Sequence, residues 1–149
     1  MNRMHSQRGV TLIELVVVMI IVGILTAIAI PSYRSYVLRS QRSDAKDALL
    51  ALATQQEKHY LQCNTYAAAI ADATDCLAGE LQGAAVSKNG WYQLTIPGGN
   101  ATTFSVQATA IAGESQFQDE DCRSFTVTQA GVRSALNSSN ADNTAECWR

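Results

Sequence analysis

Hydrophobic residues are concentrated in one run near the N-terminus, and apolar positions in the remainder of the chain are periodic. Residues 10–30 are almost entirely apolar, and their single charge is Glu14. At 1.5 Å per residue, a helix of this length extends about 30 Å, which matches the hydrocarbon core of a bilayer. The pattern therefore predicts a membrane-spanning helix over residues 10–30.

Helical periodicity replaces the apolar run after Pro31. Proline lacks a backbone N–H, so Pro31 is expected to kink or interrupt the helix. Apolar residues spaced i, i+3, i+4 and i+7 predict an amphipathic stem helix over residues 31–62. Its packed face should carry Ala45, Ala48, Leu49, Leu52, Ala53 and Tyr60, and its opposite face Arg42, Asp47, Gln55 and Lys58. We read Arg34, Arg39 and Arg42 as solvated, with contact to anionic headgroups or neighbouring subunits as the alternative.

Residues 63–149 are expected to form a globular head. The loose pattern of residues 63–89 predicts a connecting loop with a short helix at 66–73. Alternation with period two predicts strands at 91–96, 103–111 and 124–129, with turns at 97–100 and 130–131. Such strands are typical of an antiparallel sheet with one covered face, here by the stem helix, so the predicted fold class is α+β. Residues 137–144 should be irregular and fixed by Cys147 and Trp148.

Chain length and net charge limit the number of domains and the classes of function that the sequence allows. The 149 residues allow one ordinary domain, and the formal charge of −2 provides no positive excess for bulk binding of nucleic acid. From Cys63 onward, four basic side chains stand against nine acidic ones, a formal charge of −5. Only a local cluster of those four cations could bind phosphates.

Four cysteines lie after the apolar run: Cys63, Cys76, Cys122 and Cys147. An even number of well-separated cysteines predicts two disulfides in an oxidising compartment, and three connectivities are open. Reduced buried thiols are one alternative. A zinc site is another, but paired-ligand spacing is missing and only His59 lies nearby. No metal and no cofactor are therefore expected.

The N-terminal run has three interpretations. It can be a secretory signal peptide cut after Ala27-Ile28-Ala29, a permanent anchor, or an anchor preceded by a short leader that ends at Arg8-Gly9. Counting Lys and Arg on the two sides does not orient the span, whereas the cysteines place the C-terminal part outside.

The third interpretation has specific support. Residues 9–14, Gly-Val-Thr-Leu-Ile-Glu, followed by an apolar helix and Pro31, resemble the N-terminus of a type IV pilin. The resemblance implies that a prepilin peptidase removes leader residues 1–9 by cutting between Gly9 and Val10, and N-methylates Val10. It also implies a long N-terminal helix packed on a small antiparallel sheet. Val10 stands where the family most often has Phe, which favours a minor subunit.

The resemblance to type IV pilins implies that Glu14 is the residue required for filament assembly. A carboxylate at the centre of a membrane span costs about 2.5–3.5 kcal/mol, and less near the interface, where it can snorkel. Leader removal would convert the Val10 amide into a charged amine, which can pair with Glu14 of a neighbouring subunit or of the same one.

The head also has pilin-like features. Residues 64–67, 121–122, 126–131 and 147–148 resemble ComP- and PilE-type minor pilins, in which a disulfide bounds a C-terminal surface loop. We predict the pairing Cys63–Cys76 and Cys122–Cys147.

No enzyme is indicated, because His5 lies in the leader and no metal-ligand set, P-loop or nucleophile elbow is present. The predicted function is that of a type IV pilus subunit, most consistent with a minor pilin, which primes or enters a surface filament for motility, adhesion or DNA uptake. Expected partners are other pilin subunits, the prepilin peptidase, the inner-membrane assembly machinery and the membrane; a DNA or surface ligand is left open. The head would lie in the periplasm before assembly and outside the cell afterwards. The alternatives are a DNA-receptor pilin for competence and a type II secretion pseudopilin.

Overall fold

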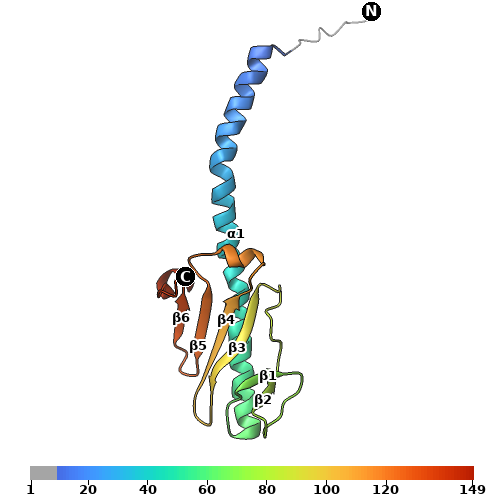
Figure 1. The fold of residues 1–149 in the computed structure, drawn as a ribbon, viewed down its shortest axis with the longest axis vertical. Coiled ribbons are helices and arrows are strands. Elements are labelled where there is room, and N and C mark those ends of the chain that lie inside the picture. The colour runs from blue at the N-terminus through green and yellow to red at the C-terminus, as the bar shows by residue number, and fades with distance from the viewer. Residues whose placement is uncertain (1–9) are drawn as a thin grey trace, which may run out of the picture. The chain divides into compact units, whose positions relative to one another are not determined.

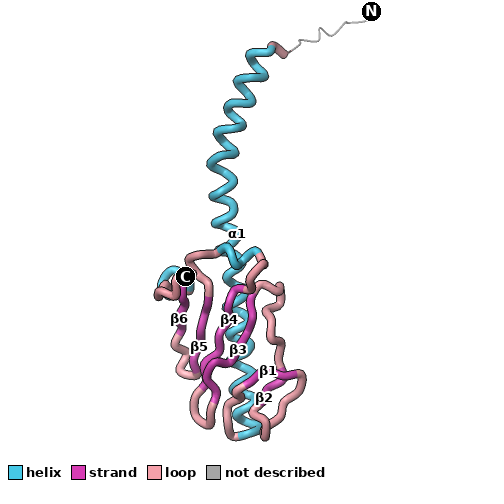
Figure 2. The backbone as a smooth tube through the Cα atoms, viewed as in Figure 1, coloured by secondary structure: helices cyan, strands magenta, loops and turns pink. Residues whose placement is uncertain are grey.

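The structure is a computed structural model and describes residues 10–149 (Figure 1). The boundary between two compact units falls between Val37 and Leu38, inside the long helix α1 (Leu12–Cys63). Figure 2 shows α1 as one uninterrupted helix. The expected interruption at Pro31 is therefore wrong, and the Ser35 hydroxyl donates a hydrogen bond to the Pro31 carbonyl (3.2 Å) within the helix. The kink remains a prediction.

In the second unit, α1 packs on the head through a narrower face than the periodicity predicted. Ala45, Leu49 and Leu52 are buried as expected. Tyr60, expected in the core, is 37% exposed, and the buried positions of this last part are Gln56 and His59. The helix ends where Asn64 takes a left-handed conformation (φ 54°), a common way to end a helix.

A four-stranded antiparallel sheet forms the centre of the head. Its order is β3 (Tyr92–Gly99), β4 (Phe104–Ala110), β5 (Ser124–Thr128) and β6 (Arg133–Leu136). One face of this sheet packs on α1 (Figure 1). Alternate strand residues are buried there, including Tyr92, Leu94, Val106, Phe125 and Ala135. The predicted α+β fold class and the helix-covered sheet are confirmed.

The elements before the sheet differ from the prediction. Residues 66–73 contain no helix; β1 (Ala69–Ala71) pairs in parallel with β2 (Glu80–Gln82). Strand β3 continues through the expected turn at 97–100, because a register irregularity between Thr95 and Gly98 accommodates the proline. The turn lies further on, where the Asn100 side-chain oxygen accepts bonds from the backbone N–H groups of Thr102 and Thr103 (2.9 Å each).

Three elements follow or interrupt the predicted strands. A 3-10 helix, η1 (Ser115–Gln118), lies between β4 and β5, and β6 was not predicted. The predicted turn before β6 is confirmed at Gly131, which has a positive φ of 72°. The C-terminal stretch contains a short helix, α2 (Thr144–Cys147).

Loops bond to the backbone at both edges of the sheet. Beside β3, the Leu94 N–H donates to the Ala85 carbonyl (2.8 Å). Beside β6, the Ala135 N–H donates to the Thr144 hydroxyl (2.9 Å), and the Asn143 N–H donates to the Ala135 carbonyl (2.9 Å). Neither edge strand therefore presents a fully open row of backbone groups.

The end of β3 packs directly against the segment that follows α1. A Cβ atom at Gly99 would overlap the Ala67 carbonyl oxygen and lie 2.7 Å from its carbon. The same Ala67 peptide is held by the buried Gln56 side chain, which donates to the Ala67 carbonyl and accepts from its N–H (2.9 Å each). The glycine thus permits a close approach that Gln56 fixes.

We expect Gly99→Ala to lower the free energy of unfolding of the head by about 1–3 kcal/mol, because the added methyl must displace backbone rather than a side chain. Chemical denaturation of the oxidised chain measures this. Gly98→Ala is the matched control, since its Cβ meets only the Ser105 hydroxyl, at 3.1 Å. Equal effects of both substitutions would contradict the steric explanation.

Candidate functional site

The N-terminal candidate site lies at the start of α1. The Glu14 N–H donates to the Thr11 hydroxyl (3.3 Å), and the Leu15 N–H donates to the Thr11 carbonyl (3.2 Å). Thr11 and Glu14 have the T-x-x-E spacing of a capping box, a sequence signal for the start of a helix at this position. A carboxylate in the first turn also interacts favourably with the helix dipole. Thr11 and Glu14 therefore define the helix end beside Val10; Gly9 lies outside the described residues.

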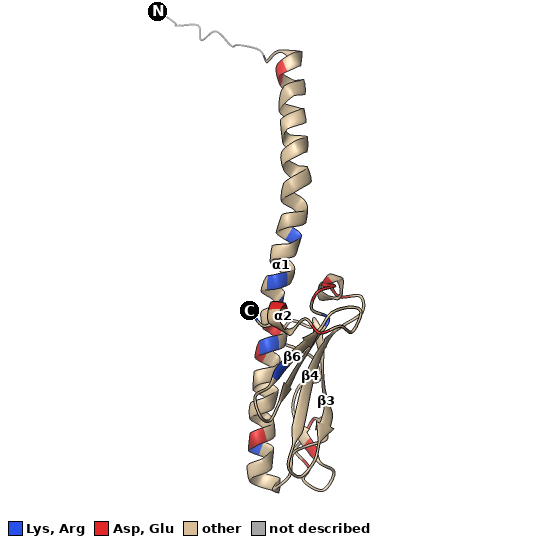
Figure 3. Cartoon of the chain, turned by 90° about the vertical axis from the view of Figure 1, so that its left-hand side faces the viewer, with Lys and Arg blue, Asp and Glu red and all other residues tan. Residues whose placement is uncertain are grey.

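The rest of this segment is uncharged and unpacked. Between Glu14 and Arg34 the helix carries no charged residue (Figure 3). A window within α1 near the N-terminus is long and apolar enough to cross a membrane, and none of it is buried inside the chain. Val10 itself is 72% exposed. The described part of the chain therefore offers this window no packing surface of its own.

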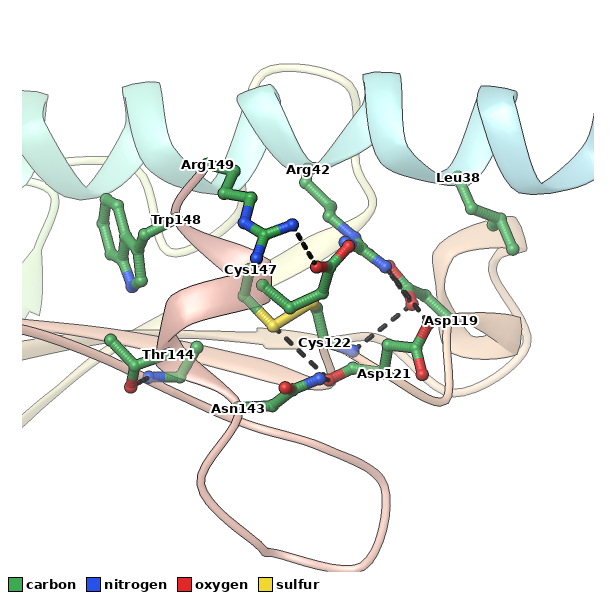
Figure 4. Close-up of a disulfide and its surroundings, with 12 residues drawn as sticks. Leu38, Arg42, Asp119, Asp121, Cys122, Asn143, Thr144, Cys147, Trp148 and Arg149 are labelled. Carbon is green, nitrogen blue, oxygen red and sulfur yellow. Dashed lines mark hydrogen bonds and ion pairs between the residues drawn. A yellow bond between two sulfur atoms is a disulfide. The ribbon is translucent and has the colours of Figure 1, made fainter.

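The two disulfides join the pairs that we predicted. Cys63, the last residue of α1, is bonded to Cys76, and Cys122 is bonded to Cys147 in α2. Figure 4 shows the second bond, beside the backbone of Asp121 and the side chain of Asn143. Each bond ties an otherwise irregular segment to a helix or to the sheet. Constraining the unfolded chain in this way stabilises the head.

A buried ion pair lies next to the second disulfide. The Arg42 guanidinium donates to both carboxylate oxygens of Asp119 (2.7 and 2.9 Å; Figure 4). The side chains are only 6% and 3% exposed. The prediction of a solvated Arg42 is therefore wrong, because helical spacing could not show that a carboxylate 77 residues later would meet it.

Asp119 accepts further hydrogen bonds beside those from Arg42. Its carboxylate accepts from the Gln116 side chain (2.9 Å) and from the Cys122 N–H (3.3 Å). The pair thus links α1, η1 and the segment that precedes β5 through one set of hydrogen bonds.

The ion pair also shifts the pKa of nearby groups. Burial opposes the charged form of Arg42, but the hydrogen bonds and the charge interaction of Arg42 with Asp119 outweigh this and raise the pKa of Arg42. Burial, then the Asp119 charge, raises the pKa of Tyr92.

Trp148 holds the C-terminal segment against the sheet, and two basic side chains lie close to its ring. Its indole N–H donates to the Ser134 carbonyl (3.0 Å), and its ring packs edge-on against Phe125. The Lys46 ammonium and the Arg133 guanidinium lie 5.9 and 5.1 Å from the ring centre. Burial, together with the charges of Arg42 and Arg133, lowers the pKa of Lys46.

The four basic residues of the head do not all lie on one surface; they are Lys88, Arg123, Arg133 and Arg149. Arg149 lies beside the Lys46–Trp148 contact, where its main-chain oxygen accepts from the Lys46 ammonium (2.9 Å), and its guanidinium pairs with Glu146 (3.1 Å). Arg123 instead stacks on Phe117 at 3.8 Å, and Lys88 lines a separate groove of about 510 Å³. We call Lys46, Arg133 and Arg149 the Trp148 cation cluster.

His59 has a packing role. Its ring is 2% exposed, and Nδ1 donates to the Thr65 carbonyl (2.8 Å). Within residues 10–149, no three His, Cys, Asp or Glu side chains are placed to hold a metal.

An exposed apolar helix with one carboxylate in its first turn, continuing into a disulfide-linked sheet, defines the class of type IV pilins. The chain belongs to the family described as type IV minor pilin ComP, DNA uptake sequence receptor, whose sequence model matches residues 31–126. A second model, the prokaryotic N-terminal methylation motif, matches residues 4–30.

Individual relatives agree with this assignment. A fimbrial protein of Neisseria meningitidis is 38% identical over 103 residues, covering 63% of this chain and 58% of that protein. The type IV major pilin PilA of Myxococcus xanthus is 48% identical over 59 residues, which is 40% of this chain and 27% of that protein. The chain thus spans about a quarter of the length of that relative.

Among solved structures, the minor pilin PilV of Neisseria meningitidis matches with a TM-score of 0.52 at 20% identity. The match covers 72% of this chain and 94% of PilV, and it supports the fold. By the family match over residues 31–126, the chain is a ComP-like type IV minor pilin, and type IV pilins are a family of structural subunits.

Proposed function

We propose that this minor pilin is made as a precursor anchored in the inner membrane by α1, with its head in the periplasm. A prepilin peptidase then cuts between Gly9 and Val10 and methylates Val10, and the assembly machinery inserts the mature subunit into a surface filament with other pilins. The observation that carries this proposal is Glu14, which lies in the first turn of α1 and is the single carboxylate of the exposed apolar part of that helix, residues 12–33.

The chemistry of assembly follows from the position of Glu14. Removal of the leader would create a cationic amine at Val10, and Glu14 of a neighbouring or of the same subunit supplies the opposite charge. In a filament core with little water, such a pair interacts more strongly than at a surface, although both groups lose hydration. Processing would thus create the group that assembly requires.

Cleavage gives a direct test. We expect the mature membrane form to begin at Val10, with a mass consistent with one or no added methyl group, measured by intact mass spectrometry. Gly9→Leu should retain residues 1–9, because the bulky side chain occupies the position that the peptidase reads. Asn2→Leu, within the same leader, is the control and should be processed normally. A mature chain that begins at Ile30 would show signal-peptide cleavage instead.

A second candidate function is binding of duplex DNA by the head. Two observations favour it: the Trp148 cation cluster and the description of the matching family as a DNA uptake sequence receptor. The formal charge of −5 over residues 63–149 opposes it. A cluster of so few cations would release few counterions and would bind with a shallow salt dependence.

Filter binding of the full chain in detergent, at several salt concentrations, separates the two functions. A purely structural subunit should retain negligible duplex DNA at physiological salt. A DNA-binding head should retain it, and Arg133→Ala should weaken binding and reduce the slope of log affinity against log salt by about one. Arg123→Ala is the matched control because the Arg123 guanidinium stacks on Phe117 and not on Trp148. Equal losses in both variants would argue against a site at Trp148.

A further inference from the structure

We propose that Tyr33 and Tyr36 anchor α1 at one interface of the bilayer and thereby hold Glu14 at the other interface, outside the hydrocarbon core. The proposal rests on the membrane-anchored form described above, and it is independent of filament assembly. It involves only the unit that ends at Val37.

The uncharged part of α1 has the length of one hydrocarbon core. Glu14 and Arg34 enclose 19 residues without a charge. In a helix these span about 28 Å, against a core of about 30 Å. Because no apolar length is left over, a displacement of one turn would draw either Glu14 or Arg34 into hydrocarbon, which is unfavourable in both directions.

The interior of this segment is compatible with lipid along its length. Thr26, its polar side chain nearest the middle, donates its hydroxyl to the carbonyls of Val22 (2.9 Å) and Gly23 (3.0 Å). That hydroxyl therefore needs no partner outside the helix. Glu14 differs, because a charged carboxylate needs water or a headgroup, which the end of the helix can reach.

Tyr33 and Tyr36 have the chemistry and placement of interfacial anchors. They are 69% and 71% exposed, and their i, i+3 spacing puts both rings on one side of the helix. Tyrosine combines an apolar ring with a polar hydroxyl, so it is enriched where lipid chains meet headgroups. Tyr33 directly precedes Arg34 and Tyr36 follows it by two residues, so the two rings lie where the uncharged segment ends.

Depth measurements test the proposal. The full chain, with its native disulfides oxidised, is placed in phosphatidylcholine–phosphatidylglycerol vesicles, with spin labels on single cysteines introduced from Ile13 to Ser32. Accessibility to oxygen and to a water-soluble nickel complex gives the depth of each label. We expect the label of Ile24→Cys to be deepest and the labels of Ile13→Cys and Ser32→Cys to be interfacial. An Ile13→Cys label deep in hydrocarbon would overturn the placement of Glu14.

The anchors are tested by substitution. In the double variant Tyr33→Ala/Tyr36→Ala, the deepest position should move toward the C-terminus by less than one helical turn, because Arg34 opposes a larger displacement. Tyr33→Trp/Tyr36→Trp should preserve the depth, and Tyr60→Ala is the control in the head. An unchanged depth in the double alanine variant would overturn the anchoring role alone. A water-exposed Ile24→Cys label would instead show that α1 does not insert, which would overturn the membrane anchor of the proposed function.

Discussion

Glu14→Ala should leave the processed protein in the membrane. Its amount in sheared surface filaments should fall at least about tenfold relative to the wild type. The Val10 amine would then lie unpaired in the filament core, and a buried charge that loses its partner costs about 3–5 kcal/mol. Insertion should be unaffected or improved, since the substitution removes a charged group at the edge of the span. Immunoblots of membrane and sheared fractions measure the distribution.

Two comparisons make this test specific. Glu14→Gln should show a smaller loss, because an amide oxygen still accepts a hydrogen bond from the amine. Thr26→Ala is the matched control, since the Thr26 hydroxyl bonds only within its own helix. If Glu14→Ala enters filaments as well as the wild type, charge pairing does not drive incorporation of this subunit. Pilus number should be counted in parallel, because a subunit at the filament tip would influence initiation.

Asp119→Ala should be among the most destabilising single substitutions in the head, lowering the free energy of unfolding by about 3–5 kcal/mol. It leaves the Arg42 guanidinium buried, with the nearest remaining carboxylate, Asp121, 3.7 Å away. It also removes the acceptor for Gln116 and for the Cys122 N–H. Chemical denaturation of the oxidised chain measures the loss.

The control for this prediction is Asp121→Ala, whose side chain is 68% exposed and should contribute less than about 1 kcal/mol. The double variant Arg42→Met/Asp119→Leu should regain much of the stability, because an apolar pair leaves no buried charge without a partner. If Asp119→Ala were as mild as Asp121→Ala, the ion pair would not hold the helix to the head.

Local patterns predicted the fold where burial is periodic. The alternation in β4 and β5 and the spacing of Ala45, Leu49 and Leu52 each report one buried face, and all were located correctly. The β1–β2 pair could not be predicted, because three-residue strands that pair in parallel carry too little alternation. Strand β6 begins with Arg133 and Ser134, so its pattern is also weak.

Some residues of the candidate site could be identified from sequence, and others could not. Glu14 is identifiable from sequence because a charge within an apolar run needs no tertiary information to be noticed. Arg42 was misplaced because its partner, Asp119, comes from a loop whose position only the folded sheet determines. The cations around Trp148 come from α1, β6 and the C-terminus, so sequence supplies their number but not their proximity.

The backbone bonds at the two sheet edges restrict how heads can associate. A neighbouring chain that added a strand would have to displace residue 85 from β3, or residues 143–144 from β6. The second segment lies within the loop closed by Cys122–Cys147, so oxidation of this pair protects that edge. Heads should therefore meet through side-chain surfaces, and a chain that stays reduced after export should be prone to cross-β aggregation through β6.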